Sequence, residues 1–206
     1  LIAPTSTKHR STVVIVVQML DGYHGTLTTR CALQLAPLVF VRPGELRAAE
    51  WKDIDLEAGE WRYLVSKTKT DHIVPLSRQA VAILKELHPL TGHARYVFPS
   101  PRTDTKPMSD NAILSALRRM NIPKDEMTGH GFRAMARTLL HERLKFPPEI
   151  IEHQLAHSVP DALGSAYNRT RFLDDRRVMM QAWADYLDQL KAGAVIIPIN
   201  PTALHV

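Results

Sequence analysis

The sequence predicts a mainly α-helical domain that also contains a small antiparallel β-sheet, an α+β fold. Apolar residues recur mostly at the helical spacing of three or four positions, whereas residues 60–76 alternate in the manner of a β-hairpin. The 206 residues suffice for one substantial core. We therefore expect one domain over residues 12–190, preceded by a linker at 1–11 and followed by a tail at 191–206.

The first part of the chain contains three candidate elements. Residues 12–21 carry a Val and Ile run that fits either a strand or a helix. Residues 27–40 predict a buried helix with a bend at Pro37. Another helix is expected to begin at Pro43, because a proline in the first turn gives up an N–H that has no helical partner there.

The middle of the chain changes period. Trp61, Tyr63 and Val65 alternate with polar residues and precede a polar turn and a second apolar run, which predicts the hairpin. Ser77 is expected to cap the following helix, since its hydroxyl can accept a bond from a first-turn N–H. Residues 96–100 fit a short strand or a turn.

The remaining elements are predicted to be helices. Ser109 is expected to cap one of them, and further helices are expected at 130–144, 148–155 and 174–190. The last helix closes the domain with one apolar stripe. Its members are Met179, Trp183, Tyr186, Leu187 and Leu190.

Composition narrows the class of protein. The net charge of +5 and the ten histidines favour a polyanionic partner, nucleic acid first. Cys31 is the single cysteine, so no intramolecular disulfide can form and a reducing cytoplasm fits best. The apolar run 13–17 is too short to span a bilayer, and we expect no membrane partner.

Common cofactor and metal motifs are missing from the sequence. It contains no GxxxxGK[ST], GxSxG or HExxH, and "HERLK" at 141–145 ends in lysine. His153 and His157 have the spacing of zinc ligands on a helix, but no third ligand stands nearby. No close group of Asp and Glu suggests a two-metal nuclease. We therefore expect neither a metal nor another cofactor.

Several polar residues have two interpretations each. Arg42 precedes Pro43, which keeps it out of the helical region at a fixed corner, where it either binds an anion or pairs with Glu45. His130 and Arg133 share one face of a predicted helix, either as functional groups or as a cap and a surface arginine.

Lys67 and Lys69 lie near the hairpin tip, where they would enter a DNA groove or form a solvated turn. Tyr167 stands in a polar, basic context beside Arg169 and Arg171, and a half-buried structural tyrosine is the alternative.

Taken in order, these residues form a specific pattern. The phrases "ALQLAPLVFVRPGELRAAEW", "HIVPLSRQAVAIL", "HGFRAMARTLLHER", "QLAHS", "AYNR" and "MMQAWADYLD" carry it. The sequence resembles the tyrosine recombinase (phage integrase) family, and most closely its P4-prophage type, over about residues 26–190. The resemblance implies the integrase catalytic-domain fold, and it implies that 1–11 is a linker from an upstream DNA-binding region.

The resemblance also implies a reaction and its residues. A tyrosine hydroxyl attacks a DNA phosphodiester, a 3′-phosphotyrosyl bond forms, and the 5′-hydroxyl leaves without metal or ATP. The implied catalytic residues are Arg42, Lys67, His130, Arg133, His157 and the nucleophile Tyr167, with Glu45 in support and Lys69, Arg169 and Arg171 as DNA contacts.

Within this reaction the residue types have distinct uses. Arg42 and Arg133 would clamp phosphate oxygens, Lys67 would protonate the leaving oxygen, and His130 would be the base or orienting partner of the tyrosine. His157 would donate a hydrogen bond to the phosphate, and Glu45 would orient a catalytic arginine. Lys69 is the reserve candidate for the general acid.

The same resemblance implies partners and leaves alternatives. Expected partners are double-stranded DNA attachment sites and other protomers in a tetrameric synapse, with a host DNA-bending protein or an excisionase as further candidates. The process would integrate or excise a prophage or genomic island in a bacterial cytoplasm. The alternatives are a catalytically silent DNA-binding regulator and a type IB topoisomerase-like enzyme that relaxes DNA.

Overall fold

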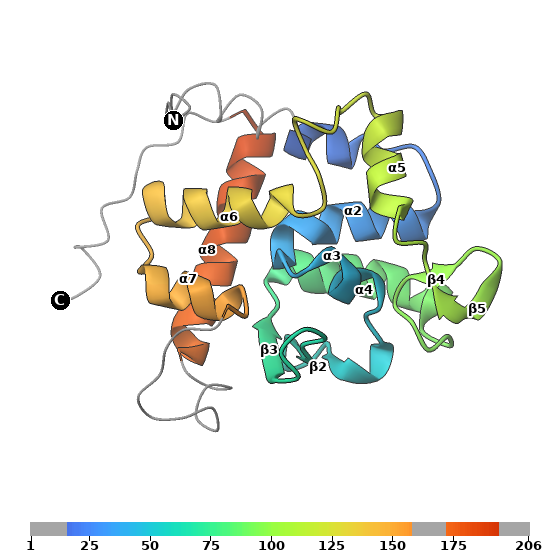
Figure 1. The fold of residues 1–206 in the computed structure, drawn as a ribbon, viewed down its shortest axis with the longest axis horizontal. Coiled ribbons are helices and arrows are strands. Elements are labelled where there is room, and N and C mark those ends of the chain that lie inside the picture. Colours follow the sequence, from blue (N-terminus) through green and yellow to red (C-terminus); the bar gives the residue numbers. More distant parts are fainter. Residues whose placement is uncertain (1–15, 158–171, 194–206) are drawn as a thin grey trace.

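A computed structural model describes residues 16–157 and 172–193. Residues 16–21 are helical, which confirms the helix alternative for that part of 12–21, while 12–15 lie outside the described residues. The remaining elements follow in chain order (Figure 1). They are α2 (Leu27–Val39), α3 (Pro43–Arg47), a 3-10 turn (Trp51–Asp53), β1 (Ile54–Asp55), β2 (Glu60–Leu64), β3 (Asp71–Pro75), α4 (Arg78–Thr91), β4 (Pro99–Ser100), β5 (Thr103–Pro107), α5 (Ala112–Arg119), α6 (Gly131–Glu142), α7 (Pro148–Gln154) and α8 (Leu173–Lys191).

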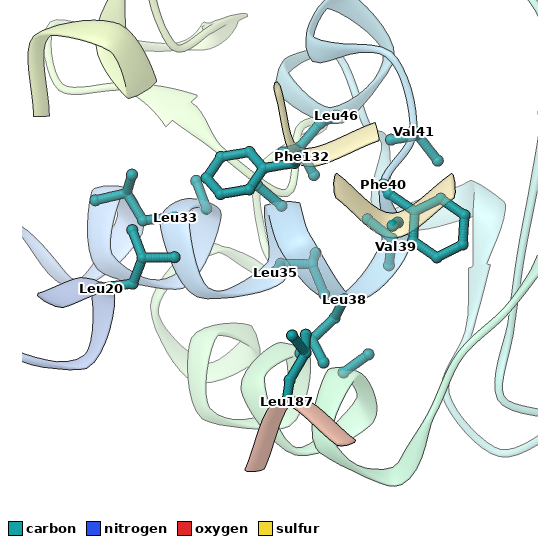
Figure 2. Packing of buried hydrophobic residues seen from close by; sticks show 14 of the residues in the cluster. Leu20, Leu33, Leu35, Leu38, Val39, Phe40, Val41, Leu46, Phe132 and Leu187 are labelled. Carbon is teal, nitrogen blue, oxygen red and sulfur yellow. The ribbon is translucent and has the colours of Figure 1, made fainter. Parts of the chain in front are cut away.

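Helix α2 lies at the centre of the domain. It is in contact with α4, α5, α6 and α8, and its residues from Cys31 to Val39 are buried except for Gln34. Figure 2 shows Leu33, Leu35 and Leu38 of this helix together with Phe132 of α6 and Leu187 of α8. Pro37 lies in its last turn, and the Pro37 carbonyl accepts a hydrogen bond from Trp183 Nε1 at 2.8 Å. The predicted buried helix with an internal proline is confirmed.

The small antiparallel sheet is confirmed as well. Strands β2 and β3 pair antiparallel from Glu60↔Pro75 to Leu64↔Asp71, and β1 adds a short third strand beside β2. A second antiparallel pair, β4 and β5, lies at the opposite end of α2 from α6, α7 and α8 (Figure 1). The fold is therefore mainly helical with two small antiparallel sheets.

Most of the predicted helices are present with shifted ends. Ser77 accepts a bond from Ala80 N at 3.3 Å and caps α4, as predicted. The predicted cap at Ser109 is wrong, because α5 begins at Ala112. Ser109 Oγ instead accepts a bond from the backbone N–H of Asn111 at 3.3 Å and shapes the turn before the helix.

Helix α3 is short, because the chain leaves it to pair with a distant segment. Glu50 forms an isolated antiparallel bridge with Tyr96, and Trp51 N donates to Arg95 O at 3.1 Å. Among the described residues, no helix is both long enough and apolar enough to cross a membrane.

Candidate active site

Arg42 stands at the corner between α2 and α3. Its backbone is extended (φ −64°, ψ 141°), as expected for a residue before proline, and it forms the N-terminal boundary of α3. Glu45 accepts a bond from Arg42 N at 3.3 Å and from its Nη1 at 3.2 Å. Pairing with Glu45 therefore holds the Arg42 guanidinium in place, while a fifth of the side chain stays exposed.

Tyr63 of β2 adds a second contact to Glu45. Its hydroxyl donates to Glu45 Oε2 at 3.0 Å. Burial, reinforced by the Glu45 carboxylate, raises the pKa of Tyr63 well above its ordinary value, so the phenol remains a neutral donor. The sequence suggested only a strand position for Tyr63, and nothing local to it indicated this link between the hairpin and Arg42.

Arg133 of α6 is buried and connects two separate segments, the one at Phe40 and the turn at 155–157. Its Nη1 donates to Phe40 O at 2.9 Å, and its Nη2 donates to Leu155 O at 2.7 Å. Nη2 also lies 3.3 Å from His157 Nε2. Burial, with the Arg42 charge as a second cause, lowers the pKa of Arg133. A guanidinium is so basic that it still carries its charge at neutral pH.

The two arginines converge on one turn after α7. Arg42 Nη2 donates to Ala156 O at 3.1 Å, the carbonyl next to the Leu155 carbonyl that accepts from Arg133. Ala156 is in the left-handed region (φ 49°), so the chain reverses here and leads directly into His157. We call Arg42, Arg133 and His157 the arginine cluster.

His157 is further connected to a carboxylate that sequence reasoning missed. Its Nδ1 lies 2.5 Å from Glu152 Oε2, and Arg137 Nε lies 2.5 Å from Glu152 Oε1. Partial burial on its own disfavours the charged carboxylate, but the bonds from His157 and Arg137 outweigh it and lower the pKa of Glu152. The only sequence signal was a glutamate five positions before His157.

His130 lies at the N-terminal end of α6, three positions before Arg133. It is exposed and occupies the position before α6, and its side chain makes no capping bond. It lines a cavity of about 230 Å³ together with Pro43 and Arg47 of α3. His130 therefore borders the same helix terminus that Arg42 precedes.

Lys67 and Lys69 occupy the turn between β2 and β3. Both side chains are exposed, and within the described part of the chain neither ammonium group has a hydrogen bond or an ion pair. Lys69 has φ 54°, and the turn is closed by Val65 N to Thr70 O at 2.8 Å. The structure thus places both candidates at the hairpin tip and joins neither of them to the arginine cluster.

Three further predicted site residues, Tyr167, Arg169 and Arg171, lie outside the described residues. Within residues 16–157 and 172–193, no group of three or more His, Cys, Asp or Glu side chains is arranged to hold a metal ion.

This fold is known from solved recombinases. The integrase from mycobacterium phage Brujita has a TM-score of 0.65 at 19% identity, over 89% of this chain and 62% of that protein. A lambda integrase tetramer bound to a Holliday junction has a TM-score of 0.52 at 18% identity, over 83% of this chain and 48% of that protein. The fold is that of an integrase catalytic domain.

Sequence comparison identifies the family. Residues 13–173 match the Phage integrase family. The integrase of Enterobacteria phage P4 is 43% identical over 185 residues, which is 82% of this chain and 42% of the phage protein. The chain therefore belongs to the phage integrase family of tyrosine recombinases, and it spans less than half the length of that P4 relative.

Proposed function

We propose that this chain is the catalytic domain of a site-specific DNA recombinase that integrates or excises a prophage or genomic island. The observation that carries the proposal is the arginine cluster. Two guanidinium groups, one from the corner before α3 and one from α6, donate to consecutive carbonyls, Ala156 and Leu155, directly before His157. Fixed guanidinium groups with spare N–H donors form a phosphate-binding arrangement.

The proposed chemistry follows from the charge that develops on the phosphate. Attack by the Tyr167 hydroxyl adds negative charge to the non-bridging oxygens, which Arg42 and Arg133 stabilise in positions fixed before the reaction. The Tyr167 oxygen bonds to phosphorus, its proton passes to a base for which His130 is the candidate, and the bond to the 5′-oxygen breaks.

The leaving 5′-oxygen needs a proton, which we assign to Lys67 with Lys69 as the reserve. The phosphotyrosyl bond keeps the energy of the cleaved linkage. Attack by a 5′-hydroxyl of a new strand then reverses the step and releases Tyr167, with no cofactor or metal consumed.

Assembly and location are part of the same proposal. The lambda relative forms a tetramer on a Holliday junction. We propose that this chain works in a comparable synapse on its attachment sites, as the domain at 12–190 of a longer protein. The place of action would be the bacterial cytoplasm. Arg169 and Arg171 are proposed as DNA contacts near the nucleophile.

The test is covalent trapping. The protein is mixed, in the presence of a chelator, with duplex DNA that spans an attachment site and is nicked near the crossover point. We expect a protein–DNA adduct on a denaturing gel with the wild-type protein and none with Tyr167→Phe. DNA binding without an adduct would favour a silent regulator, and relaxation of supercoiled DNA without site preference would favour a topoisomerase.

A further inference from the structure

The hydrogen bonds around His157 determine which ring nitrogen carries its proton. Arg133 Nη2, 3.3 Å from His157 Nε2, can only donate, so Nε2 accepts. The Glu152 carboxylate, 2.5 Å from Nδ1, can only accept when ionised, so Nδ1 carries the hydrogen. The described contacts therefore select the Nδ1–H tautomer of the imidazole.

Glu152 is suited to hold that tautomer. Its other oxygen is bound by Arg137 Nε at 2.5 Å, which fixes the carboxylate from the far side. Its pKa lies below the usual range, because the bonds from His157 and Arg137 exceed the effect of partial burial. The carboxylate is thus ionised at neutral pH and remains an acceptor for Nδ1–H.

This arrangement has a consequence for the phosphate. In the Nδ1–H tautomer, Nε2 presents a lone pair to the arginine cluster, and a lone pair repels a phosphate oxygen. With Nδ1–H committed to Glu152, Nε2 can donate to phosphate only when the ring takes a second proton from solvent. The resulting imidazolium would sit between two anions, the carboxylate and the phosphate.

We propose that Glu152 is a positioning residue that fixes the Nδ1–H of His157 and balances the imidazolium that hydrogen-bonds the phosphate. Arg133 of α6 and Glu152 of α7 contact this ring, Arg137 of α6 binds the other oxygen of Glu152, and the Arg42–Glu45 ion pair bonds to the neighbouring Ala156 carbonyl through Arg42. Among the described residues, Glu152 is the anion in direct contact with the ring. Its carboxylate therefore offsets the repulsion that the neighbouring Arg133 would exert on a charged His157. The role in phosphate binding rests on the proposed function, whereas the tautomer does not.

The first test measures the tautomer directly. The imidazole ¹⁵N shifts of His157 are recorded in the free protein near pH 8, with His157→Gln used to assign the signals. We expect a protonated Nδ1 and an unprotonated Nε2 in the wild type, and a smaller Nδ1–H population in Glu152→Ala, where only the Arg133 contact at Nε2 still favours that tautomer. An Nε2–H tautomer in the wild type, or an unchanged Nδ1–H population in Glu152→Ala, would overturn the proposal without bearing on recombination.

The second test measures adduct formation against pH. Glu152→Ala should slow it by up to about 100-fold, the lower range for losing one phosphate donor. The rate of Glu152→Ala should fall less steeply with rising pH than that of the wild type, because its neutral ring can donate from Nε2. Glu152→Gln, whose amide oxygen still accepts from Nδ1–H, should lie between the two.

Glu149→Gln on the exposed side of α7 is the matched control and should resemble the wild type in both measurements. Parallel pH profiles for the wild type and Glu152→Ala would overturn the imidazolium role. If no adduct forms with the wild type, the proposed function fails, while the tautomer measurement still decides the position of the proton.

Discussion

The arginine cluster and the tip of the β2–β3 hairpin are built in opposite ways. Arg133 is buried and donates to the carbonyls of two distant segments, and Arg42 is held by Glu45 and by a third carbonyl. Lys67, by contrast, is exposed and has no partner among the described side chains. The groups that would stabilise charge are thus fixed by the fold itself, whereas we infer that the proposed acid is positioned by DNA.

The hairpin gives the largest expected effect. Lys67→Ala should slow adduct formation by about 10²–10⁴-fold, the usual range for a general acid, with little change in stability because the side chain is exposed. A substrate with sulfur in place of the bridging 5′-oxygen should restore the rate, since a thiolate leaves without a proton.

Lys69→Ala is the matched control for this prediction and should keep most of the activity. If Lys69→Ala is the slower variant and the one that the sulfur substrate rescues, Lys69 is the acid. If neither variant is rescued, protonation of the leaving group does not come from this hairpin.

A substitution in the arginine cluster should lower both the rate of adduct formation and the stability of the fold. Arg133→Lys keeps a charge but loses the forked donors, so we expect about 10²–10³-fold slower adduct formation. Unpaired Phe40 and Leu155 carbonyls should also lower the free energy of unfolding by about 1–3 kcal/mol. Chemical denaturation measures the second effect.

Arg102→Lys, at an exposed position, serves as the control and should match the wild type in both assays. Full stability of Arg133→Lys would contradict the bracing role, and full activity would contradict the phosphate clamp.

His72 connects the β2–β3 hairpin to α7, and it should make the stability of the fold depend on pH. It lies on β3, and its Nε2 donates to the Gln154 carbonyl of α7 at 3.2 Å. Burial, then the Arg176 charge, lowers its pKa from 6.5 to about 3. Below pH 6.5, His72 therefore becomes protonated in the unfolded chain but stays neutral in the folded chain. Stability present above pH 6.5 should be lost as pH falls toward 3, by about 1.4 kcal/mol per pH unit.

Unfolding titrations between pH 7 and 5 test this, because carboxylates titrate mostly below that window. His72→Gln should lose this dependence, even if it is less stable at pH 7. Equal slopes in the two proteins would show that another group is responsible.

The sequence predicted those parts of the fold that depend on local periodicity. The buried stripe of α8 and the alternation of β2 were visible because side chains on one face recur at a fixed spacing. Strand β5 was missed, because Thr103–Pro107 is polar and lacks an apolar alternation, although it pairs antiparallel with β4. The early end of α3 depends on the distant Tyr96, which no local pattern indicates.

In the candidate site, too, contacts between residues near each other in sequence could be predicted, whereas contacts between distant segments could not. Arg42 and Glu45 lie in one turn, so their contact was among the sequence alternatives. The anchors of Arg133, the Phe40 and Leu155 carbonyls, were not predicted. Each lies at a chain reversal where Phe40 or Ala156 takes a positive φ (36° and 49°) that non-glycine residues rarely adopt. Glu152 on a short helix resembles an ordinary solvated charge until the chain reverses and brings His157 back onto it.

The smallest expected effect concerns the turn that carries His130. A Cβ added at Gly129 would lie 2.8 Å from Pro43 Cγ and 3.2 Å from its Cβ, and a proline ring cannot turn aside. Gly129→Ala should therefore push the His130 turn away from α3, at a cost of about 1 kcal/mol in stability, as for mild overpacking. Adduct formation should fall by about tenfold at most, since a full 1 Å misplacement costs about 100-fold.

Gly44→Ala is the matched control, because a Cβ there meets nothing within 4 Å and alanine favours the helix by about 0.5–1 kcal/mol. A rate loss in Gly129→Ala with unchanged stability would mean that His130 must be placed more accurately than the fold requires. Unchanged rate and stability would mean that Pro43 does not position His130. The turn would then belong with the hairpin tip, among the groups that DNA positions, and not with the arginine cluster.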